Sequence, residues 1–146
     1  MRGKLVKMER EDDRRKDKNW EPYYERTKGL KPHENVTEFL KKGVKPGKAI
    51  DLGCGAGRDT IGLLKNGWDV LSIDREEKAK GKILEQLETN DFCKFRFIQG
   101  DFRYVELEKT DLIVSNLTLS FCPKNDFKIL WDKINSSIID GRLFCW

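Results

Sequence analysis

Apolar residues along this chain alternate between short continuous runs and stripes with helical spacing. The short runs, which are typical of buried strands, lie at residues 48–52, 68–73, 95–98, 111–115 and 142–146. Stripes with apolar residues three and four positions apart predict helices at residues 36–40, 61–64, 75–88 and 123–138. Strands separated by helices imply right-handed crossovers, so we expect an α/β fold with a doubly wound, mostly parallel sheet covered on both faces.

The composition fits a single globular domain preceded by a charged tail. The chain has 146 residues, of which 38% are hydrophobic and 37% charged. Residues 1–19 hold eight Lys or Arg and five acids, whereas the other 127 residues carry 21 bases and 20 acids. We therefore divide the chain into a tail (residues 1–19) and a domain (residues 20–146). The near-neutral domain predicts no nucleic-acid partner, because nucleic-acid binders carry a basic face on their folded part.

Hydropathy and cysteine spacing exclude further classes of protein. No stretch approaches 18 apolar residues and the N-terminus has no apolar core of a signal peptide, so we expect a cytoplasmic protein without a membrane partner. The four cysteines lie 39, 29 and 23 residues apart, and His33 is the one histidine. This spacing predicts no metal site, because structural zinc needs closely paired ligands.

The first predicted strand ends in a glycine-rich turn, Asp51-Leu52-Gly53-Cys54-Gly55-Ala56-Gly57-Arg58. Glycines allow a tight turn and let a ligand approach the backbone at the start of the following helix. The G-x-G-x-G spacing differs from the G-x-G-x-x-G pattern of dinucleotide binders, and Arg58 occupies the place of their third glycine. This spacing disfavours a nicotinamide-dependent oxidoreductase, which ranks below the two functions considered at the end of this section.

Polar residues also follow the next three strands. Asp74 and Arg75 end the second strand, Asp101 and Phe102 follow the third, and Asn116 follows the fourth. A carboxylate at the second position can accept both hydroxyls of a ribose, and one at the third can accept the amine of adenine. Singly, each polar residue here can be a helix cap or turn residue, and Cys54 can be a small buried thiol. Their common register favours a nucleoside site.

These motifs resemble those of class I S-adenosylmethionine-dependent methyltransferases. The segment from Lys45-Pro46-Gly47-Lys48 through Gly67-Trp68-Asp69-Val70 is especially similar to the tellurite-resistance and thiopurine-type small-molecule branch, and Trp20-x-x-Tyr23 resembles the N-terminal segment of that branch. The resemblance covers about residues 20–146 and implies a Rossmann-like sheet in the order 3-2-1-4-5. It implies S-adenosylmethionine as cofactor, held by Asp51, Gly53, Cys54, Gly55, Arg58, Asp74, Arg75, Asp101, Phe102 and Asn116. By resemblance, Gly53, Cys54 and Gly55 border the methionine, Asp74 holds the ribose, and Asp101 with Phe102 holds the adenine.

Two departures from the family pattern affect the prediction. Leu117-Thr118 follows Asn116 in place of a Pro-Pro-aromatic run, which disfavours adenine-N6 and glutamine acceptors. The family's sheet continues through two strands that this chain lacks, so residues 142–146 form a sheet edge. Apolar edge strands recruit further strands, and we expect self-association there.

The leading function is therefore methyl transfer to a small-molecule acceptor by in-line displacement, a reaction that needs alignment more than a dedicated nucleophile. No catalytic residue is assigned. A catalytically impaired S-adenosylmethionine-binding or interaction protein is the alternative, because the last strands are absent. Tyr23 and Tyr24 either cover the sulfonium or pack the N-terminal helix, and His33 either starts a helix or acts as a base.

Overall fold

The structure is a computed structural model that describes residues 18–145, with side chains as far as Ile139. The predicted tail therefore lies almost wholly outside the described residues. The helices are α2 (Glu21–Thr27), α3 (Glu34–Lys41), α4 (Arg58–Lys65), α5 (Glu77–Leu84) and α6 (Lys124–Ser137), with short 3-10 turns at Phe92–Lys94 and Leu119–Phe121. The strands are β1 (Lys48–Leu52), β2 (Asp69–Asp74), β3 (Phe95–Gln99), β4 (Thr110–Val114) and β5 (Ile138–Cys145).

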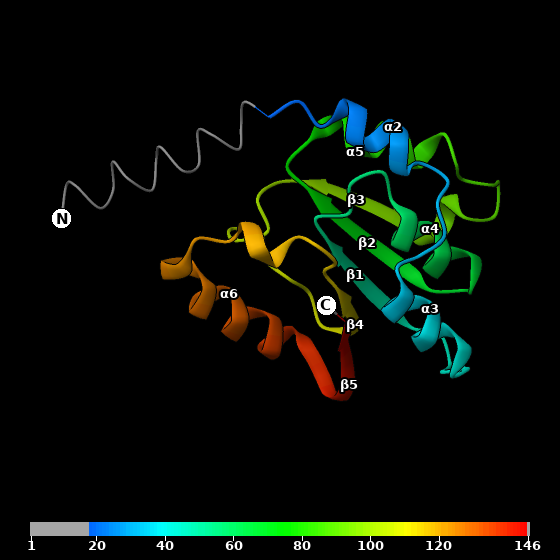
Figure 1. Cartoon of the computed structure of the whole chain (residues 1–146). Helices are drawn as coiled ribbons and strands as arrows, with labels where there is room; N and C mark the ends of the chain where they lie inside the picture. Colours follow the sequence, from blue (N-terminus) through cyan, green and yellow to red (C-terminus); the bar gives the residue numbers. More distant parts are fainter. Residues whose placement is uncertain (1–17, 146) are drawn as a thin grey trace.

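The five strands form one parallel sheet in the order β3-β2-β1-β4-β5, which confirms the predicted fold class and strand order (Figure 1). The order reverses at β1, which pairs with β2 on one side and with β4 on the other. In open sheets of this kind, ligands bind beyond the carboxyl ends of the strands at the point of reversal. The glycine-rich turn after β1 lies at this point.

The sheet is buried on both faces, as its near-continuous apolar strands require. Residues of one face pack with α3 and α4 in a core of Val36, Phe39, Ala49, Leu63, Leu64, Trp68, Val70, Leu112 and Val114. Residues of the other face pack with α6 in a core of Ile50, Leu52, Leu71, Ile73, Phe102, Ile113, Leu119, Leu130 and Ile134. Neighbouring strand residues such as Ala49 and Ile50 point into different cores, so the period-two alternation of a strand builds both layers.

The N-terminal helix α2 lies beside α5, near the carboxyl ends of the strands (Figure 1). Tyr24 of α2 packs with Cys54, Ala56, Ala79 and Ile83 in a third buried cluster. Lys82 of α5 forms ion pairs with Glu21 and Glu25 of α2. The first described helix is therefore docked on the domain and reaches the end of the sheet where a ligand is expected.

The clearest differences from the sequence prediction are the ends of two helices. The helix predicted at residues 75–88 is shorter, because α5 ends at Leu84. The predicted helix through Ile138 ends one residue earlier, because Ile138 has an extended backbone (ψ 129°) and pairs with Thr110 as the first residue of β5. An apolar residue that continues a helical stripe also suits a buried strand, so periodicity alone placed Ile138 wrongly.

Strand β5 therefore begins four residues before the predicted segment 142–146. Within residues 18–145 it pairs with β4 alone and forms one edge of the sheet. Among the same residues, no helix is both long and apolar enough to cross a membrane.

Candidate cofactor site

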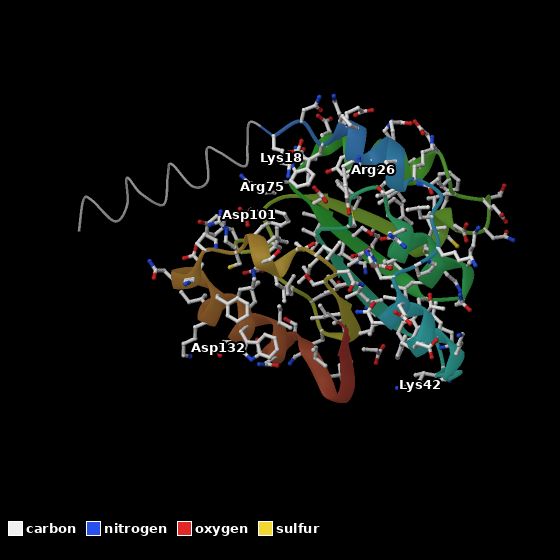
Figure 2. All side chains as sticks on the ribbon, viewed as in Figure 1. Lys18, Arg26, Lys42, Arg75, Asp101 and Asp132 are labelled. Atoms are coloured by element: carbon white, nitrogen blue, oxygen red, sulfur yellow. The ribbon has the colours of Figure 1, made fainter. Side chains whose placement is uncertain are left out.

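A cavity of about 420 Å³ lies at the carboxyl ends of the strands. Five segments line it: N-terminal residues (Lys18, Trp20, Tyr23, Tyr24), the loop after β1 (Gly53, Gly55), the end of β2 (Asp74, Arg75, Glu76), the loop after β3 (Asp101, Phe102) and the loop after β4 (Asn116, Leu117, Thr118, Ser120, Phe121). Figure 2 shows Lys18, Arg75 and Asp101 on the same side of the molecule. The cavity has the size of a cofactor pocket.

The loop after β1 has a backbone that favours glycine at three alternate positions. Gly53, Gly55 and Gly57 have φ values of 68°, 54° and 84°, in the left-handed region that side chains disfavour. A Cβ at Gly53 would lie 2.2 Å from the Thr118 side chain. The turn thus brings its backbone close to the loop after β4 and leaves the cavity wall free of side chains at Gly53 and Gly55.

Asp74, at the end of β2, is fixed by backbone amides. Its Oδ2 accepts a hydrogen bond from the Gly55 N–H at 2.9 Å, and its Oδ1 accepts one from the Glu76 N–H at 2.9 Å. The Tyr24 side chain, which is 3% exposed, lies close to this carboxylate. Burial raises the pKa of Asp74 and these hydrogen bonds counteract the rise, while burial and the nearby carboxylate raise the pKa of Tyr24. The acid is held in one orientation at the cavity wall.

Asp101, after β3, is held by arginines. Arg103 donates to both Asp101 oxygens, at 2.6 to 3.1 Å, and Arg75 lies 3.8 Å from Oδ2. Burial alone would raise the pKa of Asp101, but the Arg103 hydrogen bonds outweigh it and hold the pKa below its usual value. Arg103 is itself buried and also pairs with Asp126 of α6 at 3.0 Å. Asp101 is therefore ionised and rigid.

Lys133 of α6 fixes the same loop from the other side. Its Nζ donates to the carbonyl oxygens of Phe102, Arg103 and Val105 at 2.6, 3.0 and 2.7 Å. Burial lowers the pKa of Lys133, and the nearby Asp101 opposes this change. The ammonium satisfies three carbonyls of an irregular segment, which otherwise lack partners from a helix or a sheet. This contact positions Phe102, which is 7% exposed, at the cavity.

Aromatic side chains close the cavity on the N-terminal side. The Trp20 ring lies edge-on to Tyr23 and to Phe121, with centroids 5.8 Å apart in both pairs. Tyr23 and Tyr24 are 6.2 Å apart in the same geometry. Such edge-to-face contacts stabilise aromatic clusters beyond their buried area. The segment before β1 and the loop after β4, distant in sequence, thus form one wall.

A smaller cavity of about 40 Å³ adjoins the first on the far side of the glycine turn. It shares Tyr23, Gly53, Gly55 and Asn116 with the larger cavity, and its other lining residues are Thr27, His33, Asp51, Cys54, Ala56, Gly57, Arg58 and Asp59. A space of this size accommodates a few atoms or an ordered water. The two cavities meet at the turn.

A polar network crosses the small cavity. Asp59, which is 4% exposed, accepts hydrogen bonds from the Asn116 Nδ2 at 2.9 Å and from the His33 backbone N–H at 2.8 Å. The His33 ring Nδ1 lies 2.8 Å from Asp59 Oδ2, and Asn35 donates to Asn116 Oδ1 at 2.8 Å. The network links the start of α3 and the first turn of α4 to the end of β4. His33 stands at the N-cap of α3, as its helix-start interpretation predicts.

Asp51 and Cys54 are buried beneath the turn. Asp51 is 3% exposed and accepts a hydrogen bond from the Thr60 hydroxyl at 2.7 Å. Burial, together with the nearby carboxylate of Asp59, raises the pKa of Asp51. Burial likewise raises the pKa of the Cys54 thiol, so this cysteine is a small buried group and not a reactive thiolate.

The ten predicted site residues divide between the two cavities. Seven line the larger one: Gly53, Gly55, Asp74, Arg75, Asp101, Phe102 and Asn116. The other three, Asp51, Cys54 and Arg58, line the smaller one. Arg58 uses its Nε to donate to the Lys31 carbonyl oxygen at 2.7 Å. The strand-end residues are thus brought together, whereas the residues of the turn itself contribute to both cavities.

Sequence reasoning missed several residues that shape the site. Phe121 and Lys18 lie outside any strand-end motif, and neither has a spacing that marks it. Arg103 and Lys133 act only through contacts across the fold, over 23 residues to Asp126 and about 30 residues to the loop after β3. Asp59 could have been predicted from the sequence as a site residue, because an acid in the first turn of the helix after a glycine turn lies near the strand ends. Within the described residues, no group of three or more His, Cys, Asp or Glu side chains is arranged to hold a metal ion.

Comparison with known proteins gives a consistent family. The model of the family described as "Tellurite resistance protein TehB" matches residues 14–141. The carboxy-S-adenosyl-L-methionine synthase of Shewanella sp. (strain ANA-3) is 30% identical over 114 residues, which are 74% of this chain and 47% of that protein. The ribosomal RNA small subunit methyltransferase C of Alcanivorax borkumensis is 36% identical over 72 residues, which are 49% of this chain and 22% of that protein.

Solved structures show the same fold. TehB from Haemophilus influenzae has a TM-score of 0.65 and 25% identity, over 77% of this chain and 39% of that chain. The glycopeptide N-methyltransferase MtfA in complex with S-adenosyl-L-methionine has a TM-score of 0.68 and 20% identity, over 80% of this chain and 54% of that chain. The chain thus spans 22% to 54% of the length of these relatives.

Proposed function

This chain belongs to the TehB family of tellurite resistance proteins, and on that premise we propose that it is an S-adenosylmethionine-dependent methyltransferase with a small-molecule acceptor. One observation carries the proposal: the amide of Gly55 in the glycine turn fixes the Asp74 carboxylate at the wall of a 420 Å³ cavity. A bare backbone turn beside an oriented acid suits a nucleoside joined to an amino acid tail.

The acid at β2 has the capacity to hold a ribose. An ionised carboxylate offers about four lone-pair sites, and the amides of Gly55 and Glu76 occupy two of them. Two sites remain for the two ribose hydroxyls. The short pre-formed bonds mean that Asp74 does not have to reorganise when the ligand binds.

The adenine is assigned to the end of β3. Phe102 gives an apolar surface for the base, and the loop that carries it is fixed by Lys133. Asp101 is already bonded to Arg103, so its remaining acceptor capacity is smaller than that of a free acid. We therefore assign Asp101 at most one charge-assisted contact to the base, beside its ion pair with Arg75. Phe102 provides most of the packing against the base.

The remaining residues align and shield the reactants. S-adenosylmethionine supplies, when bound, a methyl group on a sulfonium that is already activated for displacement. Trp20, Tyr23 and Phe121 exclude water from the side of the cavity that faces the N-terminal helix. The turn residues Gly53 and Gly55 let the ligand approach the backbone. Binding and alignment of this kind supply most of the rate enhancement when no proton has to be moved.

Several observations support a small acceptor in the cytoplasm. The domain carries 21 bases and 20 acids, so it lacks the charge excess with which RNA-binding surfaces attract phosphates. The ribosomal RNA methyltransferase relative matches only 72 residues. Cys54, Cys93 and Cys122 are free thiols, as is usual in a reducing compartment.

Calorimetry with S-adenosylhomocysteine tests the binding half of this proposal, and NAD is the matched negative ligand. We expect one S-adenosylhomocysteine per chain and no heat from NAD. Transfer of a labelled methyl group to a panel of thiols, amines and oxyanions then separates an active enzyme from a catalytically impaired binding protein. Binding of NAD in preference to S-adenosylhomocysteine would overturn the assignment in favour of an oxidoreductase.

Self-association at the sheet edge stays a prediction. Strand β5 pairs with β4 alone among the described strands, and its sequence is apolar at Leu143, Phe144 and Cys145. Light scattering over a dilution series, repeated with Phe144→Lys, distinguishes association through this edge from a monomer that the substitution leaves unchanged.

A further inference from the structure

We propose that Trp20, Tyr23 and Phe121 form an acceptor site that selects amines and stabilises the methylated product as an ammonium. This inference rests on the proposed function and names its substrate class. The three rings are called the aromatic wall below. The wall is built by two segments that are about 100 residues apart in sequence and meet at the cavity.

The aromatic wall already holds an ammonium in this structure. The Nζ of Lys18 lies 4.2 Å from the centroid of the Trp20 ring and 5.9 Å from that of Phe121. Both distances are within the range of cation–π attraction, and Trp gives the strongest interaction of the aromatic residues. Lys18 is exposed and also lines the cavity. The wall therefore attracts a primary ammonium, and the chain supplies one of its own.

The wall lies where an acceptor is expected. The assigned ligand contacts run along the ends of β1, β2 and β3, from the glycine turn through Asp74 to Asp101. Phe121 belongs to the loop after β4, which is the next strand end on the other side of β1. An acceptor on this side approaches the turn from the direction opposite to the adenine. In-line displacement needs such an approach, because the nucleophile must attack the methyl group from the side away from the sulfur.

An amine acceptor fits the charge balance of the transfer. The nitrogen lone pair forms a bond to the methyl carbon, and the electron pair of the carbon–sulfur bond goes to sulfur. The positive charge thus moves from the sulfonium to the new ammonium, and no charge is created or lost. An acceptor that arrives as an ammonium first loses a proton to solvent, and the neutral amine then supplies the lone pair. The negative faces of the rings stabilise the cation as it forms.

The wall disfavours an anionic acceptor. Ring faces repel anions, and the cavity is lined by three acids, Asp74, Glu76 and Asp101, and two bases, Lys18 and Arg75, with Asp101 paired to the buried Arg103. Arg75 lies 3.8 Å from Asp101, so part of its charge is compensated by that acid. Figure 2 shows Arg75 and Asp101 adjacent to each other, with Lys18 above them. An amine therefore suits the wall better than an oxyanion.

The test is a binding comparison that needs no turnover. Choline carries a quaternary ammonium and cannot be methylated further, and 3,3-dimethylbutan-1-ol has the same shape without the charge. Each is titrated by calorimetry into the protein saturated with S-adenosylhomocysteine. We expect choline to bind about tenfold more tightly than the neutral alcohol, the scale of one desolvated cation–π contact.

Two substitutions assign the effect to named side chains. Trp20→Leu keeps an apolar residue and removes the ring, so the preference should fall to about twofold or less. Lys18→Gln removes the internal competitor, so choline should bind about threefold more tightly than to the unmodified chain. Ile129→Thr, at a position on α6 that is 68% exposed, is the control and should change neither value. The melting temperature shows whether the Trp20→Leu variant remains folded. If that variant is unfolded, Trp20→Phe replaces it in the titrations and should keep part of the preference for choline.

The outcomes separate this inference from the proposed function. Binding of S-adenosylhomocysteine with equal affinities for choline and the alcohol overturns the aromatic acceptor site and leaves the methyltransferase assignment intact. A preference for choline that survives Trp20→Leu also overturns it. Failure of S-adenosylhomocysteine to bind overturns both proposals. A preference that depends on Trp20 and increases in Lys18→Gln supports the site.

Discussion

The carboxylate of Asp74 accepts the backbone N–H of Gly55 at 2.9 Å, across the gap between the ends of β2 and β1. This bond joins the turn that approaches the ligand to the acid that we assign to its ribose. Gly55 has a φ of 54°, so the backbone turns at this residue and does not continue as a helix or strand. The acid and the turn are therefore positioned by each other before any ligand is present.

Substitution of Asp74 tests the ribose assignment. Asp74→Ala removes the acceptors for the ribose hydroxyls and leaves the Gly55 amide without its partner. We expect the affinity for S-adenosylhomocysteine to weaken by about 1.5–3 kcal/mol, the scale of hydrogen bonds to a charged group. Calorimetry gives this value directly.

The control for this substitution is Asp132→Ala, which removes an exposed acid that pairs with Lys128 on α6, away from the cavity. Its affinity should equal that of the unmodified chain. An Asp74→Ala variant that binds as tightly as this control would remove the ribose role.

The sequence allowed the sheet and the strand-end acids to be predicted because both depend on local signals. Apolar runs such as residues 69–73 specify strands, and the acid that ends each run is carried to the sheet edge by the parallel topology. Ile138 was misplaced because a buried strand and a helical stripe have the same composition over a few residues. Because the strand ends meet at one edge of the sheet, seven of the ten predicted site residues line the larger cavity.

The rest of the site depends on contacts between segments that are distant in sequence. Phe121 meets Trp20 across 101 positions, and Lys133 reaches the carbonyl of Phe102 across 31. No periodicity encodes such a meeting, since it depends on where whole elements dock. A charged residue such as Arg103, which is 9% exposed, is indistinguishable in sequence from a solvated one until its partners are known.

Two glycine substitutions compare the left-handed backbone of the glycine turn with the ordinary helical backbone of α5. Gly53→Ala places a methyl group in the left-handed region and 2.2 Å from the Thr118 side chain, so we expect a loss of about 2 kcal/mol or more in the free energy of unfolding. Gly81→Ala, in α5 with no atom within 4 Å of the new Cβ, should gain about 0.5–1 kcal/mol. Urea denaturation measures both. Equal effects of the two substitutions would contradict the geometry of the turn.

The buried Asp51 predicts a pH dependence of stability. Burial raises its pKa in the folded state above the ordinary 3.8, so the folded state binds the Asp51 proton more firmly than the unfolded state does. The stabilisation from this group is complete below pH 3.8 and is lost as the pH rises toward the folded pKa.

Asp51→Asn removes this titration and keeps an acceptor for the Thr60 hydroxyl. The variant should gain stability relative to the unmodified chain as the pH rises, by about 1 kcal/mol or more between about pH 5 and about pH 8. Urea denaturation without ligand at both pH values gives the difference. A constant difference, or one that shrinks as the pH rises, would show that Asp51 stays ionised in the fold.

The last prediction concerns Lys133, whose ammonium binds three carbonyls of the loop after β3. Lys133→Met keeps the apolar stem and removes these charge-assisted bonds, so Phe102 loses its fixed position at the adenine end. We expect the affinities for S-adenosylhomocysteine and for 5′-methylthioadenosine to fall by the same factor, about tenfold, the scale of one hydrogen bond to a charged group. Lys128→Met, five residues earlier on α6 with a side chain 86% exposed, is the matched control and should bind both ligands normally. Because 5′-methylthioadenosine has no amino acid tail, a loss confined to S-adenosylhomocysteine would place the effect of Lys133 at the other end of the cavity and contradict its role beside the adenine.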